Sequence, residues 1–65
     1  MTGTVVEFDE ARGIGVVRAD DDVQHFFHCT AIADGTRTIA IGALVAFEVV
    51  PGRRGQWEAT RLTPA

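Results

Sequence analysis

Two histidines and one cysteine are the residues of this sequence whose types and spacing come nearest to those of a metal site or a catalytic pair. His25, His28 and Cys29 lie close together in the chain. If they belong to a strand, His25 and His28 point to opposite faces, as do His28 and Cys29, because side chains alternate along extended backbone. A shared metal ion or a Cys–His nucleophile pair needs side chains that converge. We therefore predict no metal site, no cofactor and no catalysis, and we interpret Cys29 as a small, half-buried apolar side chain.

The charge balance of the chain limits which partners it can bind through bulk electrostatics. Nine acidic residues face six arginines, lysine is absent, and the formal net charge is -3. This balance argues against a cationic patch that holds phosphates by charge alone. The acidic run Asp20–Asp22 lacks the spacing and closing glutamate of a calcium loop, so we interpret it as a solvated turn.

The length and the apolar patterning predict one small domain that does not enter a membrane. Sixty-five residues allow a single domain, residues 1–65, with one small core. The segment Met1–Glu10 has neither the basic nor the apolar region of a signal peptide. No apolar stretch approaches the roughly 20 residues needed to cross a bilayer. We expect a cytoplasmic protein that is a monomer or a weak dimer.

Apolar residues recur with a period of two, which is typical of strands. The pattern predicts five of them, at residues 3–8, 14–19, 23–28, 44–50 and 57–62. One helical turn is expected at Thr30–Ala33, followed by a long polar connection, Asp34–Gly42, and a later turn at residues 51–55. Closing five short strands into a barrel removes exposed sheet edges. We therefore predict an all-β, antiparallel Greek-key barrel.

Within these strands, alternation predicts which side chains form the core and which lie outside. The expected core residues are Val5, Val17, Phe27, Ile32, Val45 and Phe47. His25 should point inward with Phe27, where its imidazole would need a hydrogen-bond partner. Gly15, inside the second strand, indicates a bulge or the close approach of another group.

The second and third strands should together present an apolar strip. If they pair, Ile14 and Val16 share one face with Phe26 and His28. Such a strip suits stacking against flat rings, because every nucleobase has a π-face.

In its motifs, the chain resembles a cold-shock domain, the small OB-fold barrel that binds single-stranded RNA and DNA. The resemblance covers nearly the whole length. Gly3–Asp9 is similar to the family's Gly-x-Val-Lys-Trp-Phe-Asn, and Arg12–Val17 to its first motif, Lys-Gly-Phe-Gly-Phe-Ile. His25–Ile32 is similar to the second motif and its extension, Val-Phe-Val-His-Phe-Ser-Ala-Ile. Gly42–Phe47 resembles Gly-x-x-Val-x-Phe, and Arg54-Gly55 with Glu58–Leu62 resembles the closing segment.

The chain also departs from the family at the ligand face, which the family builds from exposed aromatic rings flanked by lysines. Glu7 stands at the tryptophan position, aliphatic Ile14 and Val16 replace two phenylalanines, and Cys29 replaces a third. Each stacked base is worth roughly 1–3 kcal/mol, so the missing rings should weaken binding. Arg12 replaces the motif lysine, and Trp57 matches no family aromatic.

Together these features predict that the chain binds single-stranded RNA or DNA without catalysis. The predicted binding residues are Phe8, Arg12, Ile14, Val16, Phe26, His28, Arg54 and Trp57. Phe8 could equally close the bottom of the barrel, and Trp57 could equally pack at its rim. The resemblance implies RNA chaperoning or regulation of gene expression, often on cold stress. The alternative is a degenerate cold-shock fold that binds a protein partner through its apolar face, since a protein interface needs exposed apolar area and no rings.

Overall fold

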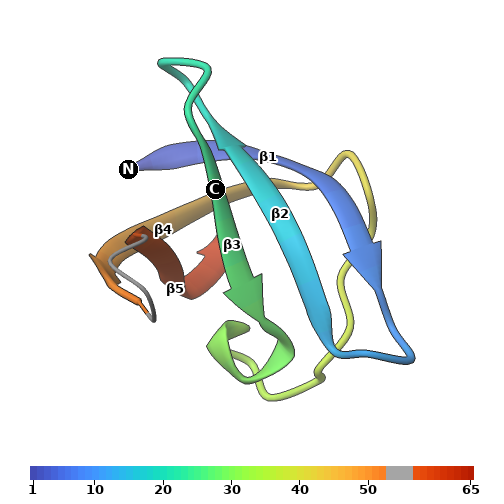
Figure 1. Ribbon diagram of the computed structural model, residues 1–65. Coiled ribbons are helices and arrows are strands. Elements are labelled where there is room, and N and C mark those ends of the chain that lie inside the picture. Colours follow the sequence, from blue (N-terminus) through green and yellow to red (C-terminus); the bar gives the residue numbers. More distant parts are fainter. Residues whose placement is uncertain (53–56) are drawn as a thin grey trace.

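A computed structural model describes residues 1–52 and 57–65 of the chain. It contains five strands, which are β1 (Thr2–Asp9), β2 (Ile14–Ala19), β3 (Gln24–His28), β4 (Leu44–Pro51) and β5 (Trp57–Pro64). Figure 1 shows β1, β2 and β3 side by side, with β4 and β5 crossing behind them. The five predicted strands are confirmed with end shifts of at most two residues.

The strands close into a barrel in the order β1-β2-β3-β5-β4. Four of the five neighbouring pairs are antiparallel, whereas β3 and β5 run parallel and meet at Phe26 and Glu58. The predicted barrel is therefore confirmed, with this parallel contact as the one departure from antiparallel pairing among the described strands. It arises because the chain crosses the end of the barrel between β3 and β4 before β5 returns along β3.

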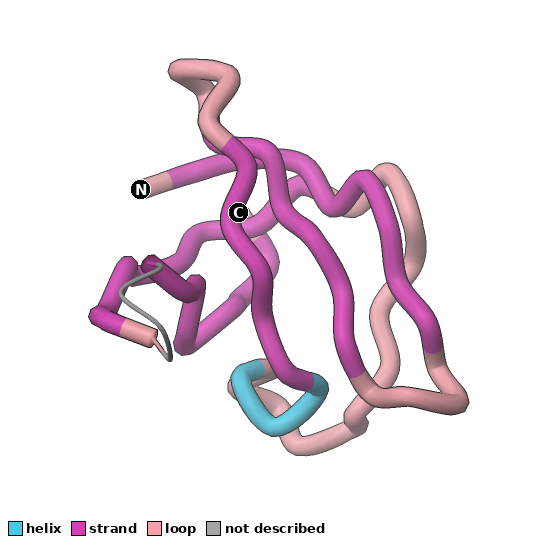
Figure 2. The backbone as a smooth tube through the Cα atoms, viewed as in Figure 1, coloured by secondary structure: helices cyan, strands magenta, loops and turns pink. Residues whose placement is uncertain are grey.

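The crossing consists of a short helical turn and a long irregular segment. The turn is a 3₁₀ helix, η1 (Cys29–Ala31), drawn in cyan in Figure 2. It begins one residue earlier than predicted and ends two residues earlier. The segment from residue 32 to residue 43 then passes below β2 and rises beside β1 (Figures 1 and 2). Of the predicted turn at 51–55, residues 53–55 lie outside the described part.

The core contains every residue that alternation placed there. Nine apolar side chains form one buried cluster, made of Val5, Val17, Ala19, Phe27, Ile32, Val45, Phe47, Ala59 and Leu62. At roughly 25 cal/mol per Å² of apolar surface removed from water, this cluster is the main favourable contribution to folding in a domain of this size. In the described part of the chain, no helix is long and apolar enough to cross a membrane.

A bulge in β1 sets which of its side chains face the solvent. Val5 lies opposite Val17 on β2, but the next partner, Val16, lies opposite Glu7, so Val6 is the extra residue. An extra residue reverses the alternation beyond it. Glu7 and Asp9 therefore point outward, and Phe8 points inward. Alternation without a bulge would have placed Phe8 outside.

Candidate nucleic-acid interface

The predicted strip on β2 and β3 is present, and its four residues pair across the two strands. Ile14 lies opposite His28, and Val16 lies opposite Phe26. Both pairs face outward, because the intervening residues Gly15 and Phe27 face the core. The two strands thus bring together four of the predicted binding residues.

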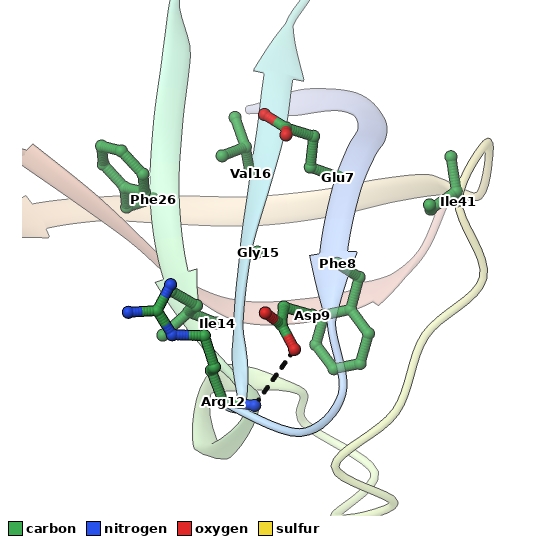
Figure 3. A pocket seen from close by; sticks show the side chains of 9 residues that line it. All are labelled: Glu7, Phe8, Asp9, Arg12, Ile14, Gly15, Val16, Phe26 and Ile41. Atoms are coloured by element: carbon green, nitrogen blue, oxygen red, sulfur yellow. Dashed lines mark hydrogen bonds between the residues drawn. The ribbon is translucent and has the colours of Figure 1, made fainter.

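A shallow hollow of about 340 Å³ lies over the outer face of β1, β2 and β3. This volume is near the lower end of the roughly 300–1,000 Å³ typical of small-ligand pockets. Figure 3 shows the side chains around it, with Phe26 on one side and Ile41 on the other. The hollow is lined by Glu7, Phe8, Asp9, Arg12, Ile14, Gly15, Val16, Phe26 and Ile41. It therefore contains five of the eight predicted residues.

Phe8 lines the hollow but belongs mainly to the barrel. Its ring stacks on that of Phe27, with the ring centres 6.0 Å apart and the planes inclined by 9°. Gly15 lies between these two residues across the sheet, paired with both. A Cβ atom on Gly15 would come within 2.5 Å of the Phe27 ring, so only glycine leaves room for the stack. The close approach predicted at Gly15 is confirmed, and Phe8 helps to close the barrel.

Phe26 and Val16 differ in what they offer a ligand. Phe26 is 55% exposed, whereas Val16 is only 8% exposed. The four residues of the predicted strip share one face, but they differ in exposure. Val16 faces outward, but its short side chain lies between Glu7 and Phe26 on the neighbouring strands. Phe26 offers a free ring face, and Val16 forms part of the floor.

Arg12 is held at one end of the hollow by a tight turn. Its backbone N–H donates to Oδ1 of Asp9 at 3.2 Å, and the N–H of Gly13 donates to the Asp9 carbonyl oxygen at 2.8 Å. These bonds fix the turn between β1 and β2, while the guanidinium stays exposed beside Ile14 (Figure 3). Asp9 is thereby oriented by the backbone that it caps.

The remaining predicted residues lie at different distances from this hollow. His28 is exposed at the end of β3 and extends the strip beside Ile14. Trp57 is 58% exposed at the start of β5, opposite Pro51, and it is not among the described residues that line the hollow. Arg54 lies outside the described residues.

Four lining residues were absent from the predicted set: Glu7, Asp9, Gly15 and Ile41. The resemblance had already placed Glu7 at the ligand face, as a departure from the family's aromatic ring, and the bulge at Val6 turns it outward there. Ile41 is 66% exposed in the connection to β4. It stands beside β1 because the next residue, Gly42, donates its N–H to the carbonyl oxygen of Val5 at 2.7 Å. The sequence signal that could have indicated Ile41 is a large apolar residue within the polar connection Asp34–Gly42.

The charges around the hollow are mixed. Its lining contains two carboxylates, Glu7 and Asp9, and one guanidinium, Arg12. A second guanidinium, that of Arg18, lies on the same outer face further along β2, where its Nε is 4.0 Å from an Asp22 carboxylate oxygen. At this distance and exposure the ion pair contributes little to stability. Such a surface cannot hold phosphates by bulk charge, so apolar contact and stacking must supply most of any affinity.

The residues considered first for chemistry do not form a reactive group. The side chain of His25 is 8% exposed and tilted against the Phe47 ring at 5.9 Å. Its Nε2 has no hydrogen-bond partner among the described residues, so the partner that we expected for this imidazole is not found on that nitrogen. Cys29 is half-buried, as predicted. No group of three or more potential metal ligands occurs within residues 1–52 and 57–65.

Comparisons with known proteins agree with this geometry. The family model described as the 'Cold-shock' DNA-binding domain matches residues 1–65. A cold shock-like protein of Listeria monocytogenes, CspLB, is 38% identical over 56 residues, which cover 85% of each chain. The cold shock-like protein CspG of Shewanella violacea is 43% identical over 58 residues, covering 83% of this chain and 80% of that one. CspA of Stigmatella aurantiaca is 43% identical over 56 residues.

Proposed function

The chain belongs to the cold-shock domain family of nucleic-acid-binding, non-enzymatic proteins, and we propose that it binds single-stranded RNA or DNA on the outer face of β1, β2 and β3. The observation that carries this proposal is the pairing of Val16 with Phe26 and of Ile14 with His28 beside one hollow. In this arrangement the Phe26 ring stacks on a base, while Ile14 and Val16 provide apolar contact beneath it. Arg12, and Arg54 beyond the described residues, contact the sugar–phosphate backbone.

The proposal includes a reduced affinity, because the strip has few rings. Two of its four members are aliphatic, and the hollow also carries Glu7 and Asp9. Base–aromatic stacking contributes roughly 1–3 kcal/mol for each base, which corresponds to about 5- to 150-fold in the dissociation constant. Replacing Ile14 by Phe should therefore tighten binding within that range. Unchanged affinity of a folded Ile14→Phe variant would contradict this part of the proposal.

A nuclear magnetic resonance titration with an oligo-pyrimidine strand and with a strand of mixed sequence, at low and at moderate salt, tests the binding face. We expect saturable shifts of backbone amides centred on Phe26 and His28. The Phe26→Ala variant should bind about 5- to 150-fold more weakly. Leu44→Ala is the matched control, because Leu44 is 67% exposed on β4 and does not line the hollow. It should leave the affinity unchanged.

The same titration separates the proposal from its alternative. If no strand shifts these amides at high micromolar concentration, single-strand binding is refuted, and a protein ligand on the apolar strip becomes the favoured function. If binding survives in Phe26→Ala but is lost in Leu44→Ala, the strand binds elsewhere on the barrel. Both outcomes contradict the proposed face.

Roles beyond binding depend on this activity. An RNA chaperone in the cytoplasm, acting as a single domain of residues 1–65, must hold unpaired strands weakly enough to release them. The family resemblance supports such a role, or one in regulating gene expression. Opening of a weak RNA hairpin labelled with a fluorophore and a quencher would test it: the protein should raise the fluorescence, and Phe26→Ala should abolish the rise. Failure of the intact protein to open the hairpin while it binds single strands would refute chaperoning.

A further inference from the structure

The carboxylate of Glu7 is placed to meet the edge of a base that lies in the hollow. Glu7 is exposed, and the bulge at Val6 turns it outward, opposite Val16 on β2. Figure 3 shows its side chain extending toward Val16, with Phe26 on the far side of that residue. Among the described residues, the side-chain carboxylate of Glu7 has neither a hydrogen bond nor an ion pair. Its oxygens are therefore available to a ligand.

Glu7 differs in this respect from the other carboxylate of the lining. Oδ1 of Asp9 accepts the N–H of Arg12 in the turn between β1 and β2. The Glu7 carboxylate instead lies beside the apolar side chain of Val16 (Figure 3). A hydrogen bond to a charged group is stronger than one between neutral groups.

Phosphates are better held away from Glu7, at the ends of the same face. Arg12 lies beyond Ile14 at one end, and Arg18 lies beyond Val16 at the other. Arg18 and Ile14 are each two residues from Val16 along β2, or roughly 7 Å at strand spacing. Guanidinium groups on both sides leave the middle of the hollow for the base rather than for its phosphate.

A carboxylate can only accept hydrogen bonds, and the four bases differ in the donors that they present to it. The Watson–Crick edge of guanine carries two adjacent donors, N1–H and the N2 amino group, which match the two carboxylate oxygens. Adenine and cytosine present one amino group beside a ring acceptor. Uracil and thymine present a single N–H between two carbonyl oxygens, and a carboxylate repels both of these oxygens. Guanine is therefore the base that Glu7 fits best, and uracil and thymine fit it worst.

We propose that Glu7 is a specificity-determining residue that selects guanine for the hollow over Val16. This inference rests on the proposed binding of single strands. It makes the acidic residue at the centre of the face a base-reading group rather than only a source of repulsion. A bidentate contact between a side chain and a base discriminates against other bases by roughly 5- to 150-fold.

Fluorescence anisotropy with labelled DNA strands of about seven nucleotides, within the roughly 4–16 that one such barrel covers, tests the proposal. The probes are an all-thymidine strand, the same strand with one central guanine, and the same strand with hypoxanthine in place of guanine. Hypoxanthine keeps N1–H but lacks the N2 amino group. We expect the guanine strand to bind at least about fivefold more tightly than the all-thymidine strand, with the hypoxanthine strand in between.

Two variants assign the preference to its residue. Glu7→Gln keeps the size of the side chain but removes one acceptor oxygen and the charge. It should abolish the guanine preference and bind the all-thymidine strand more tightly than the intact protein does. Glu10→Gln changes the net charge equally, and Glu10 does not line the hollow, so this control should keep the preference.

The outcomes separate this inference from the function on which it rests. If the protein binds all three strands with affinities within about twofold, or if Glu7→Gln keeps the preference, the role of Glu7 is refuted while single-strand binding stands. If none of the strands binds to the intact protein or to Glu10→Gln, the proposed function is refuted and the inference falls with it.

Discussion

Replacing Gly15 by Ala tests whether the stack of Phe8 on Phe27 requires a glycine between the two rings. An added Cβ would lie 2.5 Å from Cζ of Phe27, 2.9 Å from its Cε1 and 2.7 Å from the carbonyl oxygen of Glu7. All three distances are shorter than van der Waals contact, and neither neighbour can move freely. Phe27 is 1% exposed, and the Glu7 carbonyl belongs to the backbone of β1.

The expected cost follows from these contacts. Overpacking a tight interior typically costs about 1–3 kcal/mol. A change from Gly to Ala also gains about 0.4–1 kcal/mol by reducing the entropy of the unfolded chain. We expect a net loss of about 1–2 kcal/mol from a total of about 3–10 kcal/mol for a domain of this length. At about 4–8 °C for each kcal/mol, the midpoint of thermal unfolding should fall by roughly 5–15 °C.

Thermal and urea unfolding followed by circular dichroism measure this loss. Gly35→Asn is the control, because a Cβ at Gly35 meets nothing within 4 Å and asparagine tolerates the positive φ of 76° found there. It should change the midpoint little. Combining Gly15→Ala with Phe27→Leu removes the contacts with the ring but keeps the contact with the Glu7 carbonyl. In the Phe27→Leu background, Gly15→Ala should therefore lower the stability by less, but still measurably. A midpoint for Gly15→Ala at or above that of the unaltered protein would refute the steric explanation.

Two further predictions concern groups away from the binding face. Replacing His25 by Leu should raise the free energy of unfolding by about 1 kcal/mol, because it removes a buried Nε2 for which the described residues offer no partner. If urea unfolding shows that the variant is less stable by more than about 1 kcal/mol, the imidazole is satisfied or packs better than leucine. Bonds from the Thr36 backbone N–H and then its hydroxyl hold the pKa of Asp34 below its usual 3.8, so Thr36→Val should raise that pKa in a carboxyl-carbon titration. Because the pKa of Asp34 is lower in the folded state, the stabilisation by the Thr36 hydroxyl is present above the pKa of the unfolded state. It is lost as the pH falls through the pKa of the folded state. An unchanged Asp34 pKa in Thr36→Val would contradict the assignment.

Local pattern was enough to predict most of the fold. Alternation places Val17 and Phe27 inside and Phe26 outside, and the structure agrees. It also predicts that Ile14 and Val16 share a face with Phe26 and His28, and the observed pairing agrees. The parallel contact between β3 and β5 was not predicted, since it depends on the path of the long connection.

Prediction of the site was less complete, because some of its features depend on contacts between segments that are distant in the sequence. Phe8, for which the binding face and the closed end of the barrel were both open, lines the hollow and also packs its ring on Phe27. Val16 lies on the predicted face but is only 8% exposed. Ile41 was not considered, because its position depends on a hydrogen bond between Gly42 and Val5, which are far apart in the sequence.

The sequence by itself determined the strands, the core and the family, because these depend on residue type and on a period of two that any strand obeys. The resemblance placed Glu7 at the ligand face, but only the tertiary structure shows how the side chains of β1 reach their two sides. One extra residue at Val6 reverses a plain alternation, so that the Glu7 carboxylate points outward and the Phe8 ring points inward. A bulge is a mismatch between two paired strands, so it exists only once β1 and β2 have met. The chemistry of this face therefore follows from pairing, which no single segment of the sequence specifies.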